Sequence, residues 1–186
     1  WRGTNTFQEA CWAWRRLPVP VVAVVHGHCL GAGLQLALGA DLRVSTPDAR
    51  WSVREARWGL VPDMSGVRSL TELVGLDVAK ELTLTARSVT GAEAADLGLV
   101  TRVAEDPHAA AAELVGQMVA HDRRALARAR RLLDAAVGTR ARTVFARERR
   151  AQLGLLARMD RSAVPGSTAG RGTPSAAAPA PPAAPR

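Results

Sequence analysis

Two carboxylates, Glu55 and Asp63, lie in an irregular segment, residues 54–66, whose glycines and prolines predict a loop. The residues around them are apolar or bulky: Ala56, Trp58, Leu60, Val61, Pro62 and Met64. A carboxyl group in apolar surroundings keeps its proton to higher pH and becomes usable as a general acid or base. Two such groups could pass a proton from one carbon to another. The plainer alternatives are an ion pair of Glu55 with Arg54 or Arg57, and turn-capping by Asp63.

A glycine-rich turn upstream offers a second chemical group, the backbone N–H. Val19–Val25 predicts a buried strand, and Gly31-Ala32-Gly33 separates it from an apolar stretch to Ala40 that predicts a buried helix. Such a turn aims free N–H groups at one point, where they stabilise negative charge on an oxygen. Equally, the glycines could serve only the close packing of helix on strand. A dinucleotide site is excluded because the third glycine of that motif is missing.

The basic charge of the chain is carried almost wholly by arginine. The 186 residues have a formal net charge of +8, Lys80 is the only lysine, and arginines are dense from Arg123 to Arg161. Such a surface suits an anionic partner or is a solvated helix face, and we favour the second interpretation. Aromatic residues make up only 4% and tyrosine is absent, which argues against nucleic-acid binding by base stacking.

The cysteine and hydropathy patterns favour a cytoplasmic protein. Cys11 and Cys29 are isolated, without the spacing of a disulfide framework or a metal site, so we expect no metal. No apolar run reaches the length of a membrane span and no signal peptide is visible, so we expect no membrane partner. The chain begins at Trp1 rather than Met, so we expect a segment to precede it.

Short helices alternate with short strands over residues 1–106, which predicts an α/β core. Helices are expected at 4–17, 33–40, 67–74, 77–85 and after Thr90, and strands at 19–25, 41–45, 51–53 and 99–103. Residues 107–161 predict a helical segment of three runs, 107–121, 123–137 and 140–160, opened by Asp106-Pro107. Residues 162–186 are rich in proline and alanine and predict a disordered tail.

Four segments form an ordered set: Pro20–Asp41, which contains the strand and the glycine turn; Ala49-Arg-Trp-Ser-Val-Arg-Glu55; Trp58-Gly-Leu-Val-Pro-Asp63; and Thr90-Gly-Ala-Glu-Ala-Ala-Asp-Leu-Gly-Leu-Val100. Together they resemble the crotonase superfamily, the enoyl-CoA hydratases and isomerases. The resemblance runs from about Phe7 to about Arg150. It implies a crotonase-like (ClpP/crotonase) spiral of short strands and helices with a helical C-terminal segment.

The resemblance also implies an acyl-CoA thioester substrate, with an enolate stabilised on the thioester oxygen. It assigns one oxyanion-hole N–H to Ala32, while the other comes from a loop upstream of anything in this chain. The chain therefore corresponds to an N-terminally truncated family member. Coenzyme A is then part of the substrate, and no cofactor is bound permanently. Other residues of the turn and the loop are assigned to substrate binding: His28, Leu30, Gly31, Arg54 and Pro62.

The family's catalytic acids map only partly onto this chain. Hydratases use two glutamates: the second aligns with Glu55, and the first aligns with Gln35, which cannot accept a proton as a carboxylate does. Asp63 falls where dienoyl-CoA isomerases of the family carry an acidic residue. Gln35 could still hold a water or the substrate by hydrogen bonds. The set of Gln35, Glu55 and Asp63 thus favours proton shuttling over hydration.

We therefore expect an acyl-CoA-processing enzyme of the enoyl-CoA hydratase/isomerase type, acting in fatty-acid or related acyl-CoA metabolism. Family members form trimers or dimers of trimers, and the striped C-terminal helices suit such an interface, so a homotrimer or hexamer is expected. The alternative is a non-catalytic remnant or interaction module, because half of the oxyanion hole is missing.

Overall fold

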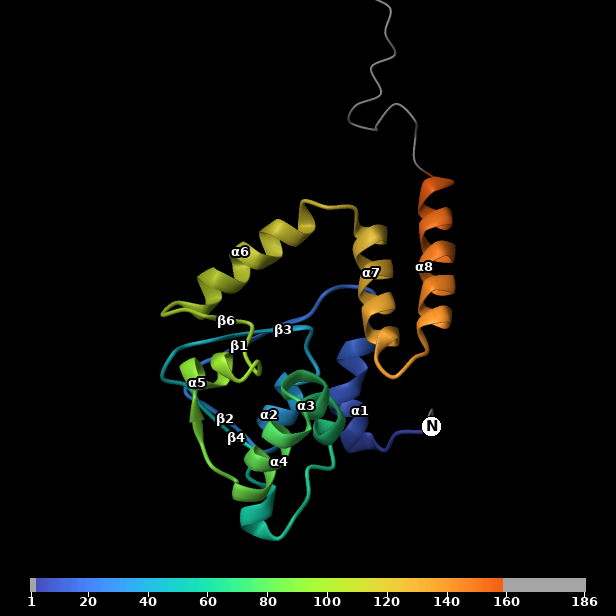
Figure 1. Cartoon of the computed structure of the whole chain (residues 1–186). Coiled ribbons are helices and arrows are strands. Elements are labelled where there is room, and N and C mark those ends of the chain that lie inside the picture. The colour runs from blue at the N-terminus through green and yellow to red at the C-terminus, as the bar shows by residue number, and fades with distance from the viewer. Residues whose placement is uncertain (1–2, 159–186) are drawn as a thin grey trace, which may run out of the picture.

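The computed structural model describes residues 3–158, which form two small sheets surrounded by helices (Figure 1). The elements follow one another as α1 (Thr6–Trp12), the 3-10 helix η1 (Ala13–Arg16), β1 (Val22–Val25), β2 (His28–Leu30), α2 (Ala32–Ala37), β3 (Leu42–Ser45), β4 (Arg50–Ser52), the 3-10 helix η2 (Glu55–Trp58), α3 (Gly66–Val74), α4 (Leu76–Thr85), β5 (Val89–Thr90), α5 (Gly91–Asp96), β6 (Arg102–Val103), α6 (Pro107–Val119), α7 (Arg123–Ala136) and α8 (Ala141–Leu156). The predicted tail, residues 162–186, lies outside the described residues.

In the described part of the chain, the strands form two three-stranded sheets. The first has the order β1-β3-β6 and is parallel, with Val24 opposite Val44. The second has the order β2-β4-β5; β2 and β4 are parallel, whereas β4 and β5 are antiparallel. β1 is followed directly by β2, and β2 leads into the glycine turn. This arrangement carries the chain from one sheet to the other immediately before α2.

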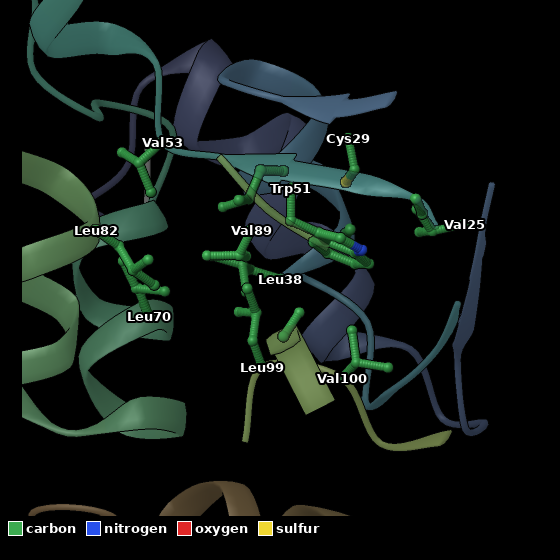
Figure 2. Close-up of a cluster of buried hydrophobic side chains, with 14 of the residues drawn as sticks. Val25, Cys29, Leu38, Trp51, Val53, Leu70, Leu82, Val89, Leu99 and Val100 are labelled. Atoms are coloured by element: carbon green, nitrogen blue, oxygen red, sulfur yellow. The ribbon is translucent and has the colours of Figure 1, made fainter. Parts of the chain in front are cut away.

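The core lies between the second sheet and the helices α2 to α5 (Figure 2). Trp51 on β4 is its largest fully buried side chain, and the indole Nε1 donates to Ser45 Oγ at 3.1 Å. That hydrogen bond satisfies the polar atom of a buried tryptophan, as packing of this residue requires. Because Ser45 lies on β3, the bond also joins the two sheets.

Four of the helices, α1, α5, α6 and α7, start at capping residues visible in the sequence. Asn5 and Gln8 form a reciprocal capping box at α1. The side chains of Thr90, Asp106 and Asp122 accept hydrogen bonds from the backbone at the starts of α5, α6 and α7. The predicted N-cap at Asp106, with proline in the first helical turn, is confirmed.

Several predicted boundaries differ from the structure; the strand expected at 99–103, for example, is reduced to β6 (Arg102–Val103). The strand expected at 19–25 begins only at Val22, after Pro20, which has no N–H to donate to a ladder. The helix expected at 4–17 is divided into α1 and η1. The strand β2 was not expected, because His28–Leu30 falls inside the segment that the glycines mark as a turn.

The three C-terminal helices differ in what they contact. α6 crosses the first sheet and packs on β1 and β3, whereas α7 and α8 form a hairpin beside α1 (Figure 1). Several large apolar side chains of this hairpin are exposed: Leu133, Val137, Phe145, Leu153 and Leu156. Within residues 3–158, no helix is long and apolar enough to cross a membrane.

Candidate active site

A pocket of about 490 Å³ opens between the glycine turn, α2 and the segment that follows β4. Most of the residues predicted for the site lie on its wall: Leu30, Gly31, Ala32, Gln35, Arg54, Glu55 and Asp63. These come from three separate stretches of sequence, and the parallel pairing of β2 with β4 brings the first and second stretches together. The structure thus gathers the residues that the motifs single out into one place.

Glu55 is the first residue of η2 and is half-buried. Its Oε1 accepts a hydrogen bond from Gln35 Nε2 at 2.6 Å. Its Oε2 is buried and has no hydrogen-bond partner in the described part of the chain. The carboxylate lies against Gly31, where an added Cβ would be 3.6 Å from Oε1. One oxygen of Glu55 is therefore held by the protein, and the hydrogen-bonding capacity of the other is unused in the described part of the chain.

The predicted alternative for Glu55, an ion pair with a neighbouring arginine, is not formed among residues 3–158. Arg57 Nε donates to the Ala86 carbonyl at 3.3 Å. Arg54 Nη2 reaches Ser88 Oγ at 3.5 Å, and the buried Arg54 Nε has no partner among the described residues. The Arg54 guanidinium therefore adds positive charge to the pocket wall without neutralising Glu55 directly.

The glycine turn positions a backbone N–H beside Glu55. Gly31 has a φ of 51°, a conformation that favours glycine, and its N–H donates to the Ser52 carbonyl at 2.9 Å. This bond ties the turn to β4. Ala32 is the first residue of α2, so its N–H has no acceptor within that helix. It lies on the pocket wall, where it can donate to an oxygen of a bound molecule.

Gln35 is almost fully buried, at 2% exposure, and its amide is engaged within the protein. Its Oε1 accepts from the backbone N–H groups of Met64 at 2.8 Å and Gly66 at 3.1 Å. With Nε2 directed at Glu55, only one hydrogen of the amide remains for a water or a substrate. The structure thus shows Gln35 principally as a link between Glu55 and the loop that carries Asp63.

Asp63 is exposed and lies on the rim that the pocket shares with a neighbouring hollow. That second hollow, of about 540 Å³, is lined by Pro62 and Ser65 on one side and by α1 and α3 on the other. Unlike Glu55, Asp63 is therefore in contact with solvent. It faces the same pocket as Glu55 from the opposite end of the irregular segment.

Two predicted binding residues lie elsewhere. His28 lines a separate hollow of about 400 Å³ along β1, together with His26. Pro62 lies in the second hollow described above rather than in the pocket of Glu55. The resemblance assigned both residues to substrate binding, but the side chains of neighbouring residues can face different cavities.

The apolar wall of the pocket was not predicted as a binding surface. It is formed by Trp58, Leu60, Val61 and Met64. The first three are highly exposed, at 77%, 64% and 72%. A run of large apolar side chains in an exposed loop is itself a signal of a binding surface, and the sequence displays it. Among residues 3–158, no group of three or more histidine, cysteine or acidic side chains could hold a metal ion.

This combination of groups suits one kind of chemistry. A half-buried carboxylate with a free oxygen can accept a proton, and a backbone N–H beside it can stabilise the oxyanion that forms. The family model for enoyl-CoA hydratase/isomerase matches residues 3–166. The chain belongs to this family. The mixed α/β fold expected from the sequence is confirmed by the solved structures of the family that it resembles.

Similar proteins include bacterial proteins of known structure and a plant enzyme. A Thermobifida fusca YX protein described as an enoyl-CoA hydratase is 42% identical, with TM-scores of 0.78 in its complex with CoA and 0.79 with acetoacetyl-CoA. These comparisons cover 81% and 82% of this chain but 59% and 60% of the other. Enoyl-CoA hydratase from Bacillus anthracis is 26% identical with a TM-score of 0.80, over 87% of this chain and 67% of that one.

The peroxisomal Delta(3,5)-Delta(2,4)-dienoyl-CoA isomerase of Arabidopsis thaliana is 39% identical over 102 residues. This match covers 55% of the present chain and 37% of the isomerase. The chain thus spans well under two thirds of this relative and of the Thermobifida structures.

Proposed function

We propose that this chain carries the proton-transfer half of an enoyl-CoA isomerase active site, with Glu55 and Asp63 as the two acid–base groups. The observation that carries the proposal is the state of Glu55: Gln35 holds one oxygen, the other is buried without a partner among residues 3–158, and Ala32 lines the same pocket. The substrate class is an acyl-CoA thioester, as in the complexes of the Thermobifida relative.

In this mechanism Glu55 takes a proton from a carbon of the acyl group. The electron pair left on carbon delocalises to the thioester oxygen, which accepts a hydrogen bond from Ala32 N–H. Asp63 then relays a proton from solvent to a different carbon, so the double bond moves and no atom is gained by the substrate. Asp63 is in contact with solvent, through which the two carboxyl groups regain their starting protonation.

Isomerisation is favoured over hydration for two reasons. Water addition in this family pairs two glutamates, whereas position 35 here is an amide without a proton-accepting oxygen. The similarity to a dienoyl-CoA isomerase also favours isomerisation over hydration. We further propose that the enzyme acts in fatty-acid or related acyl-CoA metabolism in the cytoplasm.

The test uses 3-enoyl-CoA and dienoyl-CoA thioesters, with the products analysed by mass spectrometry. Isomerisation leaves the mass of the thioester unchanged, whereas hydration adds the mass of water. We expect Glu55→Gln and Asp63→Asn each to lower the isomerisation rate by about 10²–10⁴-fold, the contribution typical of a positioned acid or base. An unchanged rate in Asp63→Asn would remove this residue from the mechanism.

The assembly expected is a homotrimer or hexamer. Its support is the exposed apolar side chains on α7 and α8, among them Leu133, Phe145 and Leu153. Single exposed apolar residues are common, but a row along a helical hairpin favours an interface. Light scattering coupled to size exclusion gives the mass directly, and Phe145→Glu with Leu153→Glu is expected to yield monomers.

A non-catalytic interaction module is the second candidate. It is favoured by the chain's coverage of only 59% of the Thermobifida structure, and by β1 and β2 lying at the ends of their sheets in the described part of the chain. The loss of one oxyanion donor alone costs about 10²–10³-fold in rate. A chain that is soluble and oligomeric, is retained on immobilised CoA and turns over no thioester would favour this candidate.

A further inference from the structure

We propose that Gln35 is a positioning residue whose hydrogen bonds hold Glu55 and the loop carrying Asp63 in fixed relative positions, an arrangement called the lock below. The positive φ of Ser65 is what allows the loop to make its part of these hydrogen bonds. The inference deepens the proposed function and rests on it for its catalytic meaning. The geometry on which it depends can be tested without any turnover.

The loop presents two N–H groups to a single oxygen. Met64 N lies 2.8 Å and Gly66 N 3.1 Å from Gln35 Oε1. Ser65, between them, has a φ of 71°, one of two positive φ values at non-glycine residues in the described part of the chain. A left-handed residue between two others turns alternate N–H groups to the same side and forms an anion-binding nest. The Gln35 oxygen fills this nest.

Nothing in the Ser65 side chain accounts for its strained backbone. Its hydroxyl is buried and has no hydrogen-bond partner among residues 3–158. A non-glycine residue in this region is energetically unfavourable, and it persists only where its surroundings impose it. The two hydrogen bonds to Gln35 are the interactions that impose it here.

Gly66, the residue after Ser65, also allows the close contact with Gln35. A Cβ on Gly66 would lie 2.6 Å from both Cγ and Oε1 of Gln35. Glycine therefore permits the close approach of the backbone to the amide, which is buried and cannot withdraw into solvent. Gly66 is also the first residue of α3, so the same contact fixes where that helix begins.

The nest decides which way the amide faces. Two N–H groups donate to Gln35 Oε1, so the NH₂ group of the amide points the other way. Its Nε2 lies 2.6 Å from Glu55 Oε1. This hydrogen bond fixes the orientation of the Glu55 carboxyl group relative to the loop. The other charged side chains on this pocket wall are Arg54 and Asp63.

The lock also reaches Asp63. Its carboxylate belongs to the residue directly before Met64, whose N–H is held by Gln35. One buried side chain, Gln35, thereby helps to fix the positions of both acid–base groups, Glu55 and Asp63. Because misplacement of a reacting group by about 1 Å can cost about 10²-fold in rate, such a link matters to a proton shuttle.

Nuclear magnetic resonance of the full chain, labelled with ¹³C and ¹⁵N, tests the geometry directly. The carboxyl carbon of Glu55 and the side-chain nitrogen of Gln35 are followed from pH 3 to pH 9. We expect the Gln35 nitrogen to shift with the same midpoint as the Glu55 carboxyl, and the Met64 and Gly66 amides to exchange slowly. A Gln35 signal indifferent to the ionisation of Glu55 would overturn the inference.

Gln35→Glu is the decisive variant, because a carboxylate oxygen also fits the nest, whereas its second oxygen then faces Glu55. Two carboxyl groups at this distance share one proton, so the pair should titrate in two steps more than about one pH unit apart. The matched control is Gln117→Glu, since exposed Gln117 Nε2 donates to Glu113 Oε1 at 3.0 Å on the surface of α6. There the two carboxyl groups should titrate together. Coincident steps in Gln35→Glu would contradict the lock.

Kinetics separates this inference from the proposed function. In an active enzyme, Gln35→Glu should move the acidic limb of the rate profile to higher pH, and Gln35→Met should lower kcat by about 10²-fold with a smaller change in KM. A chain without isomerase activity that shows the co-titration would refute the proposed function and leave the lock intact. An active chain without the co-titration would refute the lock alone.

Discussion

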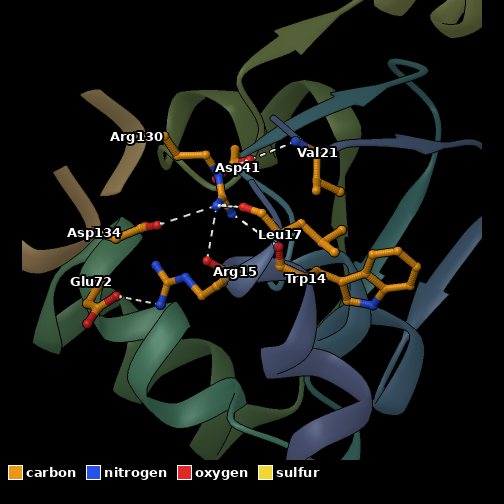
Figure 3. Close-up of polar contacts among 8 residues, drawn as sticks. All are labelled: Trp14, Arg15, Leu17, Val21, Asp41, Glu72, Arg130 and Asp134. Carbon is orange, nitrogen blue, oxygen red and sulfur yellow. Dashed lines mark hydrogen bonds and ion pairs between the residues drawn. The ribbon is translucent and has the colours of Figure 1, made fainter. Parts of the chain in front are cut away.

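Arg130 and Asp41 are 89 positions apart, yet Arg130 Nε donates to both carboxylate oxygens of Asp41 at 2.7 Å (Figure 3). Asp41 Oδ2 also accepts from the Val21 N–H, directly before β1. The remaining guanidinium nitrogens donate to the carbonyls of Trp14, Arg15 and Leu17 at the end of η1. One buried side chain of α7 thus joins the C-terminal hairpin, the N-terminal helices and the entrance of the first strand.

We expect Arg130→Met to lower the free energy of unfolding by about 3–5 kcal/mol, because it leaves the Asp41 carboxylate and three carbonyl groups without their partner. Arg130→Lys should recover only part of this loss, since an ammonium group cannot span acceptors on several sides. Urea unfolding followed by circular dichroism measures the difference. The control is Arg131→Met, an exposed position on the same helix, for which we expect a change below about 0.5 kcal/mol.

Two helical glycines should respond to alanine with opposite signs. A Cβ on Gly91, the first residue of α5, would lie 1.9 Å from the Thr46 carbonyl oxygen. Gly91→Ala must displace backbone and should lower stability by about 1–3 kcal/mol or more. Gly116, inside α6, has nothing within 4 Å, so Gly116→Ala should raise stability by about 0.5–1 kcal/mol. Thermal unfolding of both variants provides the comparison, and equal shifts would contradict the crowding at α5.

Stability should fall in alkali through the thiol of Cys29. Burial raises its pKa from 9.0 to about 12. The folded state therefore holds this proton more tightly than the unfolded state, so the thiol's contribution is fully present below about pH 9 and is lost as pH rises toward 12. The slope is about 1.4 kcal/mol per pH unit, or about 2 kcal/mol between pH 9 and 10.5. Cys29→Ala removes this component, so its unfolding free energy should decline less steeply in a urea series; parallel slopes would exclude the effect.

Local signals in the sequence were sufficient for most of the helices. The N-caps at Thr90 and Asp106 and the glycine after α3 each act within a few residues, so their effect is visible in the sequence itself. The motif residues Ala32, Glu55 and Asp63 could likewise be assigned to one site, since the resemblance covers all three, and the structure places them on one pocket.

The contacts that cross the chain could not be predicted in this way. Nothing near Arg130 in the sequence distinguishes it from the other arginines of α7, because its partners lie in η1, directly after η1 and directly before β3. The same holds for Gln35: the resemblance aligned it with a glutamate of the hydratases, whereas its hydrogen bonds to Met64 and Gly66 depend on how α2 meets the loop. Side chains that serve several distant backbone groups become visible only when the tertiary structure is known.

Trp58 should report on the acyl group of a bound thioester. Its side chain is 77% exposed, yet it forms part of the wall of the Glu55 pocket, together with Leu60 and Val61. An acyl group that enters this pocket would cover the indole, which contributes about 1–2 kcal/mol of apolar burial. We expect Trp58→Ala to weaken binding of a saturated acyl-CoA by about 10-fold and to leave binding of free CoA within about 2-fold. Isothermal titration of both ligands measures the contrast, and Trp14→Ala, at a half-exposed tryptophan in a different hollow, is the matched control. If free CoA and acyl-CoA weaken equally in Trp58→Ala, the acyl group does not lie on this wall.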